Sequence, residues 1–299
     1  MISFMKLDIS NLQYSRLTQF ANRTYPFRHI LAIACFVLIR LFSIRVILVM
    51  GMSRSGTTFI SNLLSLDNSS AYIHEPVKFL LQQKWKQENP SAEFSKEKER
   101  FWDFVFSKES LPFKWHAFMT ILLFILFKGN SSAKKYVIKP ITMIDSYEWL
   151  ARWLNADVIF ISRHPCGRLE SLLRQTKFNG IKATPERVEK WGEEWGTTHK
   201  KARDIFERNP DWIWVKFEEL CIEPIRVSKD MFEQLGLEWS KEIENEIIKM
   251  TNTDSEEFYG VNRDAQKQVE KWKLELSQDQ IEAIRKRTLP YSTKLYDGF

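Results

Sequence analysis

The sequence is poor in cysteine, glycine and proline, and its longest apolar runs are short. Three cysteines in 299 residues, none in a Cys-x-x-Cys pair, make a disulfide framework and a cysteine metal centre unexpected and favour a reducing compartment. Ten glycines and ten prolines exclude collagen-like and low-complexity chains. The runs at 30–42 and 115–127 fall short of the roughly 20 residues that a membrane-spanning helix needs. We expect a globular, cytoplasmic protein.

The two apolar runs leave two interpretations open. The run 115–127 is apolar on nearly every face and lies between Lys114 and Lys128. Such a segment suits a buried core helix, or a helix that lies in the surface of an anionic membrane. The run 30–42, with Arg40 and Arg45 at its end, could lie beside it. Peripheral membrane contact through 30–42 and 115–127 is therefore the alternative to a buried core.

Charge narrows the choice of partner only slightly. The net charge is +6, with 27% charged and 44% hydrophobic residues. A modest excess of basic residues suits a polyanionic ligand, an acidic membrane surface or nucleic acid, and does not distinguish among them.

Strand-like and helix-like segments alternate along most of the chain. Short β-branched runs predict strands at 46–50, 136–140, 157–162 and 212–216. Amphipathic periodicity predicts helices at 59–66, 143–154, 167–175, 186–208, 228–235, 242–250 and from 277 onward. This alternation predicts an α/β fold with a central parallel sheet flanked by helices. We expect an N-terminal arm at 1–45 and one domain at 46–299, with a helical insertion at 77–129 on the acceptor side.

A glycine loop follows the first predicted strand. Gly51 and Gly56 have the G-x-x-x-x-G spacing of a phosphate-binding loop, and a predicted helix follows them. A nucleoside-triphosphate loop would carry lysine at position 57, where this chain has Thr57. Its cation is Arg54, inside the loop. A single arginine with hydroxyl donors suits a sulfuryl group, which carries less charge than a γ-phosphoryl group.

The segment Arg-Ser-Gly-Thr-Thr after a strand resembles the 5′-phosphosulfate loop of the sulfotransferases, which use 3′-phosphoadenosine 5′-phosphosulfate (PAPS). Arginine at its first position is similar to the carbohydrate and bacterial branches. The resemblance implies a P-loop-kinase-like three-layer fold. It also implies that Phe59 stacks on adenine, although Phe59 suits the helix core equally well. The residues that it assigns to the phosphosulfate are Arg54, Ser55, Gly56, Thr57 and Thr58.

A second motif resembles the family's 3′-phosphate site. Arg163 ends the strand 157–162, and Ser171 follows eight residues later in the next helix. A guanidinium and a hydroxyl delivered in this way can hold one anion. The family commonly has aspartate after the arginine, and this chain has His164, which we interpret as a structural substitution.

Three weaker matches support the resemblance. Lys139 ends a strand before Pro140, where the family's lysine approaches the transferred group. Phe217 stands where the family has tyrosine before its Glu-Asp-Leu segment, so a hydroxyl contact is lost. Arg263 resembles a basic residue of the C-terminal loop that contacts the 3′-phosphate.

The acceptor hydroxyl must lose a proton, so a base is expected. The small-molecule branch uses a histidine two residues after the strand lysine, and this chain has Ile141 there. Carbohydrate sulfotransferases place a glutamate near the acceptor, about one helix past the loop, which makes Glu75 the predicted base. A turn or ion-pair role for Glu75, or His74 as the base, are the alternatives.

The resemblance therefore implies a PAPS-dependent sulfotransferase acting on a hydroxyl, with a glycan or lipid-linked sugar as the expected acceptor. Glu75, Arg54 and Lys139 are the expected catalytic residues, and neither a metal nor a nucleic acid is expected as a partner. Two other functions stay open from the residues alone. One is a P-loop nucleotide or small-molecule kinase, and the other is a non-catalytic basic module that binds anions or membranes.

Overall fold

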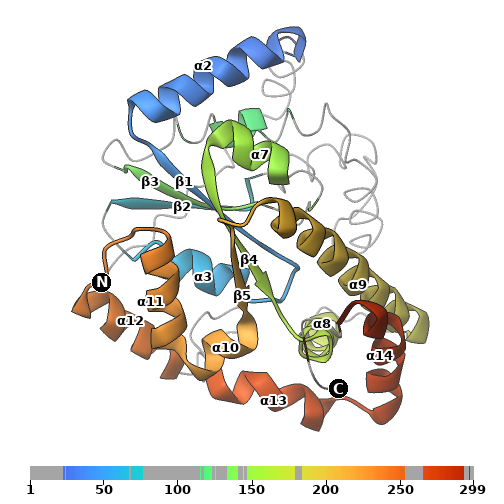
Figure 1. Ribbon diagram of the computed structural model, residues 1–299. Coiled ribbons are helices and arrows are strands. Elements are labelled where there is room, and N and C mark those ends of the chain that lie inside the picture. Colours follow the sequence, from blue (N-terminus) through green and yellow to red (C-terminus); the bar gives the residue numbers. More distant parts are fainter. Residues whose placement is uncertain are drawn as a thin grey trace. The chain divides into compact units, whose positions relative to one another are not determined.

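The computed structural model describes residues 23, 25–66, 69–76, 115, 118–122, 125, 133–140, 144, 147–178, 184–252, 265–292 and 296. The chain forms two compact units, and each is built from separate stretches of sequence. Unit 1 comprises 1–50 and 67–158, and unit 2 comprises 51–66 and 159–299. The sheet has five strands in the order β2-β3-β1-β4-β5 (Figure 1).

The strands confirm the predicted parallel sheet and add one strand. They are β1 (Arg45–Gly51), β2 (Ser70–His74), β3 (Lys135–Lys139), β4 (Ala156–Ser162) and β5 (Ile213–Lys216). Residues 46–50 of β1 are all buried, as expected for a strand with both faces covered. The strand β2 was not predicted. It pairs in parallel with β3, and its last residue, His74, lies opposite Lys139.

Unit 1 contains the described helices around β1, β2 and β3. They are the short helix η2 (Tyr25–Phe27), α2 (Arg28–Leu41), which packs on α7, and α7 (Tyr147–Leu154). No helix in the part of the chain that the structure describes has the length and hydropathy to cross a membrane. Residues 77–114 of the predicted insertion lie outside the described residues.

The second apolar run belongs to the core of unit 1. Trp115 and Phe118 are fully buried and stack with ring centroids 5.4 Å apart, and Phe118 meets Trp149 of α7 edge to face. The other described members of the run, Met119–Leu122 and Ile125, are buried as well. The interpretation of 115–127 as a membrane-contacting helix is therefore wrong for these residues, because their side chains pack inside the protein.

Unit 2 holds most of the helices among the residues that the structure describes. They are α3 (Thr57–Leu63), α8 (Pro165–Phe178), α9 (Pro185–Arg208), α10 (Phe217–Ile222), α11 (Pro224–Gln234), α12 (Lys241–Asn252), α13 (Ala265–Glu275) and α14 (Gln278–Ser292). The helix α9 begins with proline in its first turn, and the Thr184 hydroxyl accepts the Arg187 N–H at 3.4 Å. Both features favour helix initiation at this position.

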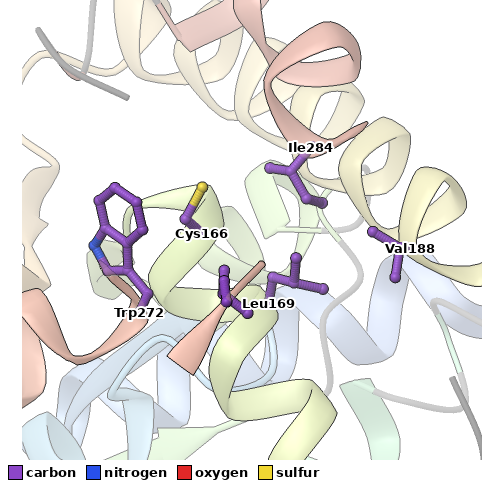
Figure 2. Packing of buried hydrophobic residues seen from close by; sticks show 6 residues of the cluster. Cys166, Leu169, Val188, Trp272 and Ile284 are labelled. Carbon is purple, nitrogen blue, oxygen red and sulfur yellow. The ribbon is translucent and has the colours of Figure 1, made fainter. Parts of the chain in front are cut away.

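Four helices of unit 2 share a hydrophobic cluster, shown in Figure 2. Cys166 and Leu169 of α8 meet Val188 of α9, Trp272 of α13 and Ile284 of α14. Burial raises the pKa of Cys166 to about 12, so its thiol stays protonated near neutral pH. This cluster holds α8, which carries Ser171, in place.

The contact between α9 and α14 depends on two glycines of α9. Gly192 and Gly196 lie four residues apart and therefore on one helix face. A Cβ atom at Gly196 would lie 2.3 Å from Cδ2 of Tyr291, and one at Gly192 would lie 2.9 Å from Cβ of Arg287. Only glycine fits these two positions at this separation of the helices.

Candidate functional site

The glycine loop of unit 2 needs glycine at both of its ends. A Cβ atom at Gly51 would lie 2.5 Å from the carbonyl oxygen of Ile161. Gly56 has φ = +93°, and a Cβ there would lie 2.8 Å from Cδ2 of Phe217. The G-x-x-x-x-G spacing thus reflects two steric requirements, and the loop leads directly into α3.

Two buried arginines hold the carbonyl groups of this loop. Arg163 Nη1 donates to the carbonyl oxygen of Arg54 at 3.0 Å, and Arg168 Nε donates to that of Ser53 at 3.3 Å. Arg54 itself has φ = +71°, an unfavourable backbone conformation for a residue other than glycine. The guanidinium contacts therefore fix a strained loop.

The structure brings the two predicted anion motifs together within unit 2. Arg54 Nε donates to Ser171 Oγ at 2.8 Å, and Arg163 lies next to the same loop. Burial lowers the pKa of Arg163, and the Glu218 carboxylate opposes this shift. Phe217 lies under the Arg163 guanidinium at 4.3 Å, so this ring supports the cation and also covers Gly56. Arg54, Arg163 and Ser171 thus form one cationic and hydroxylic cluster.

This cluster contains buried donors that the described residues leave unused. Ser55 Oγ and Arg163 Nε are both buried, and neither has a hydrogen-bond partner among the residues that the structure describes. A buried donor without a partner is costly and is typical of a site that a ligand completes. Thr57 is buried and Thr58 and Phe59 are half-buried at the start of α3. The Ser55 hydroxyl and Arg163 Nε fit a sulfate or phosphate group.

His164 occupies a structural position beside Arg163. Its ring stacks on Trp272 with centroids 4.8 Å apart, and its Nδ1 accepts the N–H of Cys166 at 3.2 Å in the first turn of α8. The His164 N–H donates to Glu218 Oε1 at 2.8 Å. An acceptor in the first turn of a helix is the role that an aspartate would fill there. These contacts agree with a structural substitution.

The predicted base and the predicted strand lysine form an ion pair in unit 1. Lys139 Nζ donates to Glu75 Oε1 at 2.9 Å, and the Glu75 N–H donates to the Lys139 carbonyl oxygen at 2.8 Å. His74 Nε2 lies 3.9 Å from Glu75 Oε2, and a 2.7 Å hydrogen bond joins His74 Nδ1 to the Tyr72 hydroxyl. The side chains of Glu75 and Lys139 are 18% and 14% exposed, so solvent reaches both. Tyr72, His74, Glu75 and Lys139 form a polar cluster at the ends of β2 and β3.

Tyr296, which no sequence motif indicates, lies beside the unit 2 cluster. Its hydroxyl donates to Ser162 Oγ at 3.0 Å, and its ring meets the His164 edge to face at 5.3 Å. Burial raises the pKa of Tyr296 well above its usual value. No motif surrounds this tyrosine, and it lies more than a hundred residues from Ser162 in the chain, so no sequence signal connects the two. The predicted site residue Arg263 and the position Ile141 lie outside the described residues.

A parallel sheet, a glycine loop after its first strand and a buried arginine holding that loop are features of a P-loop-like transferase. The model of the Sulfotransferase family matches residues 46–241, well over half of the chain. The chain therefore belongs to the sulfotransferase family, and the predicted family and P-loop-kinase-like fold are confirmed.

Solved sulfotransferase structures share this fold at low sequence identity. The chain is similar to mouse sulfotransferase SULT7A1 complexed with PAP, with 12% identity, a TM-score of 0.53, and coverage of 83% of this chain and 84% of that one. It is also similar to sulfotransferase STF9 from Mycobacterium avium, with 14% identity, a TM-score of 0.55, and coverage of 84% and 77%. No curated protein matches the chain.

Proposed function

We propose that this sulfotransferase moves a sulfuryl group from PAPS to a hydroxyl of a glycan or a lipid-linked sugar, without a metal ion. The proposal rests on the buried Ser55 hydroxyl and Arg163 Nε, which have no hydrogen-bond partner among the described residues. They belong to the same cluster as Arg54, which donates a hydrogen bond to Ser171. The mouse structure complexed with PAP supports this choice of donor. A lipid-linked acceptor would also place the enzyme at the cytoplasmic face of a membrane.

The donor-binding roles divide between the loop and the end of β4. Loop residues 54–58 would hold the 5′-phosphosulfate, and Arg163, Ser171 and Arg263 would hold the 3′-phosphate. Phe59 and Phe217 would contact the adenosine. The bound donor supplies an activated sulfuryl group with the adenosine bisphosphate (PAP) as its leaving group. Arg54 offers the moving group a positive charge and so favours the charge that develops during transfer.

Glu75 is the proposed base for the acceptor hydroxyl. Its Oε1 accepts a hydrogen bond from Lys139, so we assign the acceptor proton to Oε2. Lys139 holds the carboxylate in place and would steady the charge near the transferred group. His74, 3.9 Å from Oε2, is the alternative base.

Calorimetry with PAP tests the donor site. Wild type should bind PAP, and Arg163→Ala should weaken binding by about 2–5 kcal/mol, the usual loss for a buried charged contact. Arg226→Ala is the matched control, because Arg226 is a half-exposed arginine of unit 2 that pairs with Glu223 and Asp230. Unchanged affinity in Arg163→Ala would remove Arg163 from the site.

Transfer of radiolabel tests the reaction and the acceptor together. Labelled PAPS and a cell extract should yield label in a glycan or lipid fraction, and excess EDTA should leave the rate unchanged. Loss of activity in EDTA would contradict metal-free transfer. Label found only in protein or small metabolites would replace the proposed acceptor.

A further inference from the structure

The helix α2 carries an apolar stripe on its exposed side. Ile30, Ile33, Val37, Leu38 and Leu41 recur at helical spacing, and their exposed fractions run from 37% for Leu38 to 73% for Leu41. Phe27 and Phe42, at the two ends of the helix, are also exposed. A surface helix of a globular protein normally packs its apolar stripe against the core, whereas the stripe of α2 faces away from it.

The opposite side of α2 faces the protein. Ile39 is fully buried, and α2 packs on α7 within unit 1. The helix is therefore already anchored through its inner side, and the stripe is a second apolar surface. At 1.5 Å per residue the 14-residue helix is about 21 Å long, too short to span a bilayer.

The charged residues of the sequence segment that contains the stripe are all positive. Between residues 23 and 45 the sequence has four arginines and no aspartate or glutamate. Arg23 and Arg40 are exposed, and Arg40 Nη2 donates to the neutral Asn155 side chain at 3.3 Å. Arg45, at the start of β1, pairs with Asp157. A second copy of this helix would add charges of the same sign, whereas an anionic surface would attract this segment.

We propose that α2 is an interfacial anchor that lies flat on an anionic lipid bilayer, with its apolar stripe among the acyl chains and its arginines at the headgroups. This arrangement is the usual one for a short helix with an apolar face and basic flanks. The interaction is independent of sulfuryl transfer, because it requires neither donor nor acceptor. It would hold the protein on a membrane through the first apolar run alone, since the described residues of the second run are core.

Vesicle flotation of the full chain tests the anchor. The vesicles are pure phosphatidylcholine, or phosphatidylcholine with 30% phosphatidylglycerol, at low and high salt. Wild type should float with the anionic vesicles, and binding should weaken as salt rises. Val37→Glu and Leu41→Glu should each reduce binding at least about tenfold, since each removes a buried apolar side chain from the bilayer. Leu274→Glu is the matched control, because Leu274 of α13 is 89% exposed and lies outside the stripe.

Circular dichroism and PAP binding of each variant establish that it is folded. Wild type that stays in the soluble fraction with anionic vesicles overturns the proposal. Equal flotation of wild type, Val37→Glu and Leu41→Glu also overturns it, because another surface would then bind the lipid. If wild type does not float but forms a dimer in sedimentation, and Val37→Glu is a monomer, the stripe binds a second copy of the chain instead. PAP binding by a protein that does not float would leave the proposed transfer function standing.

Discussion

Arg54 and Glu75 both hold backbone conformations that residues other than glycine rarely adopt. Their φ angles are +71° and +45°. Such conformations cost on the order of 1–3 kcal/mol each and persist where surrounding contacts determine them. Arg163 donates to the carbonyl oxygen of Arg54, and the carbonyl oxygen of Lys139 accepts the N–H of Glu75. Backbone strain thus coincides with the proposed sulfuryl-binding cation and the proposed base.

The conformation of Arg54 allows its charge to be tested apart from its backbone. Glycine tolerates φ = +71°, so Arg54→Gly should keep the loop while removing the cation. Arg54→Ala removes the cation and adds backbone strain. We expect both variants to lose donor affinity in calorimetry by at least tenfold, with Arg54→Gly more stable than Arg54→Ala in thermal unfolding. Wild-type affinity in Arg54→Gly would show that the loop binds the donor without this charge.

Glu75 should affect chemistry and leave donor binding intact. Glu75→Gln keeps the shape of the side chain and removes its capacity to take a proton, so kcat should fall by about 10²–10⁴. PAP affinity by calorimetry should stay near wild type. Glu219→Gln, at a half-exposed position of α10, is the matched control. Turnover within a few fold of wild type would transfer the role to His74, and His74→Gln then becomes the decisive variant.

Most strands and the long helices can be predicted from the pattern of apolar residues. The strand β2 and the helix α13 cannot, because few of their side chains are buried. The strand β1 is a continuous β-branched and apolar run, so its sequence indicates a buried strand. In β2, by contrast, only Ile73 is buried, so no periodicity identifies it. Trp272 is the one buried residue of α13, whose residues the structure describes in full. That side chain, rather than an amphipathic face, attaches the helix to the core.

The sequence predicts those parts of the candidate site that local motifs define. It does not predict the contacts that depend on strand pairing or on the tertiary fold. The spacing of the loop and the offset between Arg163 and Ser171 are local features, and the structure brings these residues together. The ion pair between Glu75 and Lys139 depends on the register of β2 with β3, and no pattern in the sequence indicates that β2 is a strand. Tyr296 reaches Ser162 only through the tertiary fold.

The pairing of α9 with α14 should fail if the glycine face is filled. Gly196→Ala would place a Cβ 2.3 Å from Tyr291 Cδ2, and overpacking of this kind costs typically 1–3 kcal/mol. Urea unfolding should show that loss in free energy. Adding Tyr291→Leu to Gly196→Ala should recover part of it by making room. A Gly196→Ala protein as stable as wild type would mean that the two helices separate freely.

At the scale of the whole molecule, stability should depend on pH through a buried histidine. Burial lowers the pKa of His199 to about 3, and its ring stacks on Trp195 with centroids 3.9 Å apart. An unfolded histidine has a pKa near 6.5. Between these values the unfolded chain binds more protons than the folded one, so stability rises with pH and falls on acidification.

The slope from this one group should be about 1.4 kcal/mol per pH unit within that window. His199→Gln keeps a hydrogen-bond donor for the Trp195 carbonyl oxygen and does not titrate. The free energy of unfolding, measured with urea at pH 5 and pH 7, should therefore change less in His199→Gln than in wild type. Equal changes in the two proteins would show that His199 is not responsible.

The two units interleave along the chain, and this order has a consequence for synthesis on the ribosome. Residues 51–66 belong to unit 2, but the rest of that unit begins only at residue 159. The glycine loop therefore leaves the ribosome about a hundred residues before Arg163, the side chain that holds it. A nascent chain that stops short of β4 carries every loop residue and cannot assemble the site. The proposed donor site can thus form only late in translation, after unit 1 has been made in full.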